Sequence, residues 1–143
     1  MAIAQQKFRE IVFQLLYSLD FFQASHEEIV ELAMPLFAVT KKVIYEAIGR
    51  VELVIAVKEG IDRRIAEASI AYDFERISSV ELNILRLGVF ELLHDAEAIP
   101  GKVAIAEAIR MTRKFSTVEG AKYVNAVLDK IFQSEQLSVA CQK

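Results

Sequence analysis

Lys122, Tyr123 and Lys130 place a phenol ring beside two ammonium groups in a chain of 143 residues. If this segment is helical, each residue turns by about 100°, so Tyr123 and Lys130 lie almost in line and Lys122 lies beside them. Aromatic rings stack on unpaired bases while neighbouring cations hold phosphates, which is how many proteins bind single-stranded RNA. Half-buried packing is the simpler interpretation of Tyr123 taken alone.

Other groups in the same third of the chain extend this hypothesis. Phe115 is a candidate for a second stacking ring. Asn125 can pair with a base edge, or it can cap and crosslink helices. One helical face also collects cations, although an ordinary solvated surface explains it as well. These cations are Lys102, Arg110, Arg113 and Lys114.

Arg86 and Glu81 each have two interpretations. Arg86 falls within an apolar helical pattern, and a buried arginine needs a partner. An acid on a neighbouring helix can form an internal ion pair with it, or its guanidinium can reach a groove between helices. Glu81 stands three residues after Ser78, so it can complete a capping box. As an acid at a helix start it can also meet a basic partner protein.

Catalytic and metal-binding signatures are missing from the sequence. The only histidines are His26 and His94, and the single cysteine is Cys141. None of the three has a neighbouring pattern typical of a nucleophile or a metal site. We therefore expect neither an enzyme nor a bound cofactor or metal ion.

The composition describes a folded protein with an uneven charge. Hydrophobic residues make up 54% and charged residues 26% of the chain, and the net charge is −3. Residues 20–97 carry 15 acids and 8 bases, a net of −7, whereas residues 99–130 carry six bases and three acids, a net of +3. No run is long enough to span a membrane, and the lone cysteine suits a reducing cytoplasm.

The apolar spacing is helical almost throughout, and five glycines and two prolines leave few turns. Ser-x-x-Glu boxes at Ser25, Ser78 and Ser116 mark helix starts, and Pro100 suits a first helical turn. Thr40 is a weaker cap. We therefore predict an all-α fold, one domain without a sheet, with an N-terminal half of about 1–71 and a C-terminal half of about 72–135. The predicted helices are 4–23, 26–38, 41–59, 60–71, 79–95, 100–115 and 117–134.

Two features of the predicted core stand out. The helix from Ser79 is apolar around most of its circumference, which is typical of a central helix. Gly88 costs that helix about 1 kcal/mol against alanine, so we expect it to admit a close neighbour. Near the N-terminus, a buried stripe is predicted from Phe8 to Phe22, with a bend near Gly60 later in the chain.

Three blocks of residues follow one another in a specific order and spacing. The blocks are Leu85-Arg86-Leu87 with Phe90-Glu91-Leu92, then Ile99-Pro100 with Lys102-Val103-Ala104-Ile105 and Glu107-Ala108-Ile109, then Val124-Asn125-Ala126-Val127-Leu128-Asp129-Lys130. Together they resemble the NusB family. The resemblance is ungapped from about Val80 to Lys130 and looser at the front, where Arg9-Glu10 and Gln14-Leu15-Leu16-Tyr17 match the family's first helix. Residues 24–77 share only the helical pattern.

The resemblance implies a non-catalytic transcription antitermination factor of two helical subdomains. It implies binding of single-stranded boxA RNA in ribosomal RNA operon transcripts, a heterodimer with the ribosomal protein NusE, and indirect action on RNA polymerase. The partner-binding residues carried over are Tyr17 and Glu81. The RNA-binding residues carried over are Lys7, Arg9, Arg86, Phe115, Lys122, Tyr123 and Asn125.

The chain departs from the family's pattern at its start. The family commonly begins with an arginine cluster, whereas residues 5–9 here read Gln-Gln-Lys-Phe-Arg and supply two cations. Because each lost phosphate contact lowers affinity, we expect weaker RNA binding by the protein alone. Two alternatives remain: a helical interaction module that forms a homodimer, and a detached RNA-binding domain of a ribosomal RNA methyltransferase.

Overall fold

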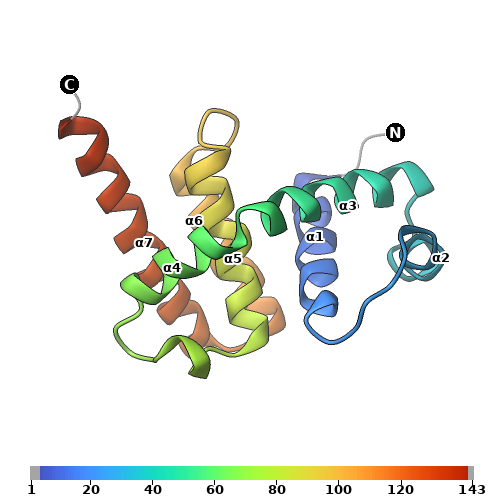
Figure 1. Ribbon diagram of the computed structural model, residues 1–143, viewed down its shortest axis with the longest axis horizontal. Coiled ribbons are helices and arrows are strands. Elements are labelled where there is room, and N and C mark those ends of the chain that lie inside the picture. The colour runs from blue at the N-terminus through green and yellow to red at the C-terminus, as the bar shows by residue number, and fades with distance from the viewer. Residues whose placement is uncertain (1–3, 142–143) are drawn as a thin grey trace. The chain divides into compact units, whose positions relative to one another are not determined.

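The computed structural model describes residues 4–141 (Figure 1). Within that range the chain forms seven α-helices, one 3-10 turn and no strand, which confirms the all-helical prediction. The 3-10 turn η1 (Phe74–Arg76) was not predicted. The helices are α1 (Gln5–Leu19), α2 (His26–Phe37), α3 (Lys41–Ala56), α4 (Lys58–Ala68), α5 (Ser79–His94), α6 (Gly101–Phe115) and α7 (Val118–Cys141).

The chain divides into two compact units after Ala56. The N-terminal unit holds α1, α2 and α3, and the C-terminal unit holds α4 to α7. We predicted a boundary near residue 71. It falls earlier because α4 packs against α5 and α7 and so belongs with the C-terminal helices.

The N-terminal unit is built on α3, which packs against both α1 and α2. On α1 the most buried apolar side chains are Ile11, Val12, Phe13 and Leu16. Phe22, at the end of the predicted stripe, is 53% exposed. The helix ends four residues earlier than predicted because the amide of Asp20 turns back to the Tyr17 carbonyl, three residues away, instead of continuing the α-helical ladder.

Side-chain caps begin several helices, though not all as predicted. Ser25 forms the full capping box with Glu28, and the Thr40 hydroxyl accepts from the Val43 amide at 3.4 Å. Ser78 accepts from the Glu81 amide, but the Glu81 carboxylate binds the Ser78 hydroxyl rather than its amide. The predicted box at Ser116 is wrong by one residue. The Thr117 hydroxyl accepts from the Gly120 amide at 2.9 Å, and α7 begins at Val118.

Other helix ends also differ from the prediction, and α4 ends at Ala68 rather than at residue 71. The break between α3 and α4 falls at Val57, whose ψ of 16° leaves the helical range, so Gly60 lies within α4. Pro100 caps α6 and Gly101 is its first residue. Helix α7 continues to Cys141 rather than ending near residue 134. An ion pair at 2.9 Å between Arg64 of α4 and Glu135 supports this extension.

Helix α5 is the centre of the C-terminal unit, as its apolar pattern predicted. Every residue from Asn83 to Leu92 is buried, because α4, α6 and α7 all pack against α5. A Cβ atom at Gly88 would lie 3.0 Å from Leu128 Cδ1 and 3.7 Å from Ala108 Cβ. Gly88 therefore admits α7 and α6 close to α5.

A bidentate ion pair joins α4 to α5. Arg86 Nε lies 2.8 Å from Asp62 Oδ1, and its NH2 nitrogen lies 3.0 Å from Oδ2. A third bond, at 3.3 Å, joins the guanidinium to the side-chain oxygen of Asn83. The Arg86 side chain is 8% exposed and that of Asp62 is 21% exposed. The internal ion pair that we considered for Arg86 is thus confirmed.

Substitution at Gly88 tests the close helix packing. Gly88→Val should lower the free energy of unfolding by about 1–3 kcal/mol, because the added methyl groups overpack against Leu128. Gly60→Ala is the matched control, since nothing lies within 4 Å of a Cβ there, and it should raise stability by up to about 1 kcal/mol. Urea unfolding followed by helical circular dichroism measures both. Equal effects of the two substitutions would contradict this packing.

The ion pair predicts a non-additive double variant. Asp62→Leu leaves the Arg86 guanidinium buried without its acid, which should cost about 3 kcal/mol of unfolding free energy. Adding Arg86→Met should recover part of that loss, because the guanidinium that has lost its acid is then removed. Glu67→Leu, an exposed acid on the same helix, should change stability by less than about 0.5 kcal/mol. Additive losses in the double variant would show that the two side chains act independently.

Candidate nucleic-acid interface

Tyr123 is held by the loop that follows α4. The Tyr123 hydroxyl lies 2.6 Å from Ser69 Oγ, which itself lies 2.6 Å from the Tyr72 carbonyl oxygen. Since the one hydroxyl hydrogen of Ser69 goes to that carbonyl, Tyr123 donates to Ser69. The Tyr72 ring meets the Tyr123 ring edge-on, with centroids 5.0 Å apart and planes at 75°. Two tyrosines thus form one fixed aromatic pair, which we call the tyrosine pair.

The Tyr123 phenol is neutral at physiological pH, and its surroundings favour that form further. Partial burial raises the pKa of its hydroxyl above the ordinary value of 10.0, and the nearby Glu81 and Tyr72 act in the same direction. The hydrogen bond with Ser69 opposes them. A neutral phenol adds no negative charge that would repel a phosphate, so the pair can accept a base at physiological pH.

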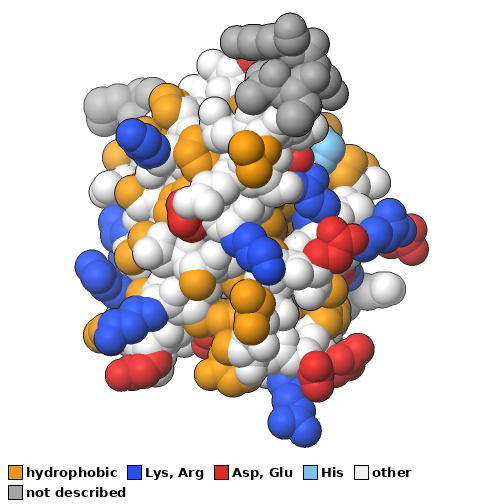
Figure 2. All heavy atoms as spheres, turned by 90° about the vertical axis from the view of Figure 1, so that its left-hand side faces the viewer, with side chains coloured by type: hydrophobic (Ala, Val, Ile, Leu, Met, Phe, Trp, Pro, Cys, Tyr) orange, Lys and Arg blue, Asp and Glu red, His pale blue; other side chains and the backbone are white. Residues whose placement is uncertain are grey.

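Exposed lysines flank the tyrosine pair on α7. Lys122 and Lys130 are both exposed, Tyr123 is half-buried, and Tyr72 is 51% exposed. Figure 2, which looks onto the side where α7 lies, shows Lys and Arg side chains with acidic and apolar side chains between them. The surface therefore offers separate cations beside rings rather than one continuous basic patch.

Phe115 lies at the end of α6, just before the turn into α7. Its ring is half-buried, and Lys114 Nζ lies 5.5 Å from the ring centroid. An ammonium group at this distance is attracted to the ring in a cation–π contact. Of the other cations on α6, Lys102 and Arg113 are exposed, whereas Arg110 bonds to Glu107 at 2.8 Å.

Two of the predicted RNA-binding residues lie apart from the tyrosine pair. Asn125 is exposed, but it follows Tyr123 by two residues and therefore projects from another side of α7. Arg86 is buried and bonded to Asp62. Its role in RNA binding stays a prediction, and its contacts favour a structural role.

The two N-terminal cations differ in exposure. Lys7 is exposed on the first turns of α1, whereas Arg9 is 8% exposed. Both belong to the N-terminal unit. The N-terminal segment, which has few cations in the sequence, therefore presents one exposed ammonium group among its described residues.

The two predicted partner-binding residues lie in different units. Tyr17 is half-buried on α1, with its ring 6.2 Å from the Phe13 ring and 5.0 Å from the Phe21 ring, which is itself exposed. In the C-terminal unit, Glu81 Oε2 accepts from the hydroxyls of Ser78 and Ser116 at 2.8 Å and 3.1 Å. Glu81 thus ties the start of α5 to the turn before α7.

Sequence reasoning missed Ser69 and Tyr72. The available signal was a tyrosine in a short polar segment just before the Ser78 cap, where an aromatic side chain has little core to enter. Nothing in the spacing could have paired Tyr72 with Tyr123, because 51 residues separate them. That pairing depends on α4 lying against α7.

The tyrosine pair and its flanking lysines are suited to binding a ligand. Among the described residues, no group of three or more His, Cys, Asp or Glu side chains could hold a metal ion. None of the described helices combines the length and apolar composition needed to cross a membrane. Rings that can stack, with ammonium groups beside them, are suited to a polyanion with accessible bases.

Comparison with known proteins gives the family. The model of the NusB family matches residues 6–133. The transcription antitermination protein NusB of Chlamydia pneumoniae is 34% identical over 134 residues, which cover 94% of this chain and 83% of that protein.

Two solved structures share the fold. T. maritima NusB is 28% identical with a TM-score of 0.75, covering 93% of each chain. The antitermination factors NusB and NusE in complex with double-stranded RNA provide a second match, at 24% identity and a TM-score of 0.76, over 91% of this chain and 96% of that one. At the latter identity the likeness shows the fold alone. With the family match over residues 6–133, these findings show that the chain belongs to the NusB family.

Proposed function

We propose that this chain is an RNA-binding transcription antitermination factor that acts in the cytoplasm without catalysis. It binds a boxA-type single-stranded element in ribosomal RNA operon transcripts together with the ribosomal protein NusE. The resulting complex helps RNA polymerase pass terminators. Membership of the NusB family and the antitermination names of its relatives support this proposal.

The observation that carries the proposal is the tyrosine pair. Ser69 fixes the Tyr123 ring, Tyr72 packs against it in a T-shaped contact, and Lys122 stands beside it on α7. A ring held in place by packing and a hydrogen bond loses little freedom when a base stacks on it. The partial exposure of both tyrosines leaves ring surface for such stacking.

Single-stranded RNA fits this surface better than a duplex does. Bases inside an RNA helix are already stacked and face a groove too narrow for side chains to read. An unpaired base can instead turn out and lie on Tyr72 or Tyr123. The rings of this chain therefore favour an unpaired strand.

NusE contributes a larger share of the RNA affinity here than in a relative that has an N-terminal arginine cluster. Lys7 is the one fully exposed cation of the first described turns, and Arg9 is buried. Since phosphate contacts supply much of the affinity for RNA, the protein alone binds weakly. NusE then adds contacts of its own, and Tyr17 and Glu81 are each proposed as residues that contact it.

The direct test is a gel shift with a boxA RNA, with and without NusE. We expect a shift for boxA over a scrambled RNA of equal length, stronger when NusE is present. Annealing a complementary strand should remove the shift, because the bases are then stacked. No preference for boxA in either setting would refute the proposed function.

Substitutions at Tyr123 separate the ring from the hydroxyl. Tyr123→Ala removes a stacking surface and should weaken RNA binding by about 1–3 kcal/mol. Tyr123→Phe keeps the ring and should bind RNA nearly normally, while losing about 0.5–1.5 kcal/mol of unfolding free energy with the Ser69 bond. Fluorescence anisotropy and urea unfolding measure the two effects.

A pair of lysine variants checks the position of the surface. Lys122→Ala should weaken RNA binding, whereas Lys42→Ala, an exposed lysine on α3, should change it much less. Both variants lose one positive charge, so net charge is matched. Equal losses for both, or normal binding by Tyr123→Ala, would place the RNA on another surface.

Because the first turn of α1 carries few cations, adding one there should strengthen RNA binding. Gln5 is exposed in the first turn of α1, so Gln5→Arg adds a cation without disturbing the core. It should strengthen RNA binding by the protein alone and steepen the salt dependence of log K by about 0.7. Gln5→Glu is the opposite control and should weaken binding. An unchanged salt slope for Gln5→Arg would exclude the α1 start from the RNA path.

A further inference from the structure

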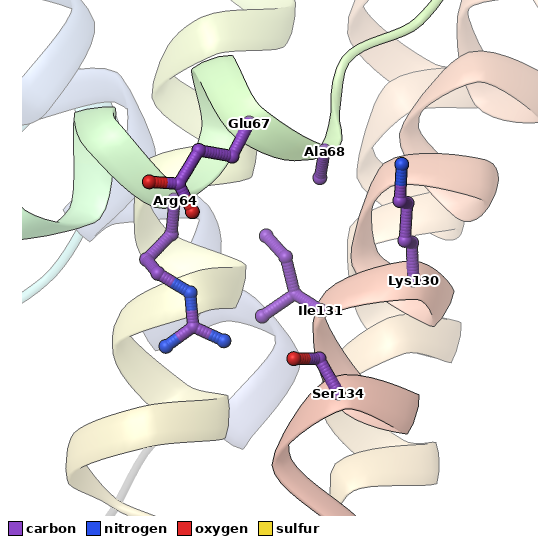
Figure 3. A pocket seen from close by; sticks show the side chains of 6 residues that line it. All are labelled: Arg64, Glu67, Ala68, Lys130, Ile131 and Ser134. Carbon is purple, nitrogen blue, oxygen red and sulfur yellow. The ribbon is translucent and has the colours of Figure 1, made fainter. Parts of the chain in front are cut away.

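A small hollow lies between α4 and α7 in the C-terminal unit (Figure 3). Its volume is about 110 Å³, which leaves room for a phosphate-sized group. Figure 3 shows the lining side chains of both helices, with the Ser134 hydroxyl pointing toward α4 and Lys130 extending along α7 away from Ser134. The lining residues are Arg64, Glu67 and Ala68 of α4 with Lys130, Ile131 and Ser134 of α7.

The hollow continues the surface that holds the tyrosine pair. Ala68, on its rim, directly precedes Ser69, which bonds to Tyr123. On α7, Lys130 and Ser134 follow Tyr123 by seven and eleven residues. At about 100° per residue both lie within about 20° of the Tyr123 direction, on one line along the helix.

That line is long enough for more than one nucleotide. Eleven residues of helix rise roughly 16 Å. Successive phosphates of a stacked strand advance about 3.4 Å, so a strand that leaves Tyr123 along α7 reaches Ser134 after a few nucleotides. A base stacked on the tyrosine pair would therefore leave its neighbours beside the hollow.

Two cationic side chains line the hollow, and one of them can bind an incoming anion. Arg64 is bound to Glu135 at 2.9 Å, so its charge is largely compensated. Lys130 is exposed and makes no ion pair within the described part of the chain. The Ser134 hydroxyl can donate a hydrogen bond at another part of the lining, whereas the Glu67 carboxylate opposes an incoming anion.

We propose that this hollow is a phosphate subsite that holds the backbone of the RNA strand beyond Tyr123. Lys130 supplies the charge, Ser134 supplies a hydrogen bond, and the Arg64–Glu135 pair holds α7 against α4 so that the hollow keeps its shape. The subsite rests on the proposed function, since it extends the same RNA surface. Glu67 limits its strength.

The experiment compares two RNAs on the full chain with NusE: a core boxA element and the same element extended by several nucleotides on both sides. The unmodified protein should bind the extended RNA more tightly. Lys130→Ala should weaken binding of both RNAs, but it should also remove most of the gain from the extension, about threefold to tenfold, and lower the salt slope for the extended RNA by about 0.7. Glu67→Gln should strengthen binding of the extended RNA.

Arg63→Ala is the matched control, because it removes one exposed cation from α4 without lining the hollow. Helical circular dichroism confirms that each variant is folded. Equal effects of Lys130→Ala and Arg63→Ala, or no gain from extending the RNA, would overturn the subsite while core binding still supports the proposed function. A loss of NusE binding by Lys130→Ala would overturn it too, in favour of a protein contact. Absence of core binding would instead refute the proposed function.

Discussion

The ion pair between Arg86 and Asp62 is the interaction on which the candidate surface depends. It fixes α4 beside the central helix α5, and α4 in turn delivers Ser69 to the hydroxyl of Tyr123. Without that placement, Tyr72 would have no fixed position against the Tyr123 ring. Apolar packing between helices is only weakly directional. The largely buried Arg86–Asp62 ion pair therefore helps to define how α4 lies against α5.

Much of the fold could be predicted because its signals are local. Helical periodicity gives all seven helices, and side-chain caps such as Ser25 and Thr40 begin them near the expected residues. The errors occur where tertiary contacts decide. Helix α7 continues to Cys141, and an ion pair between its Glu135 and Arg64 of α4 supports this extension. These two residues are 71 positions apart in the sequence. The boundary between the two units falls after Ala56 rather than near residue 71, because α4 packs against α5 and α7.

The site was less predictable, for the same reason. Tyr123 and Lys122 could be found from residue type and helical spacing, since both lie on one helix. Ser69 and Tyr72 could not, because their contacts cross 54 and 51 residues of sequence. Burial also redistributes the cations. Arg9 and Arg86 are buried, whereas Lys122 and Lys130 remain exposed. Net charge and residue counts therefore say little about which cations meet a ligand.

The central claim is that RNA lies on the C-terminal unit, along α7 and the loop that holds Tyr72. Crosslinking of a boxA RNA to the complex with NusE, followed by mass spectrometry of the linked peptides, tests it most directly. The account predicts crosslinks concentrated at Tyr72, Tyr123 and the flanking lysines of α7. Crosslinks confined to α2 and α3, with none on α7, would contradict it.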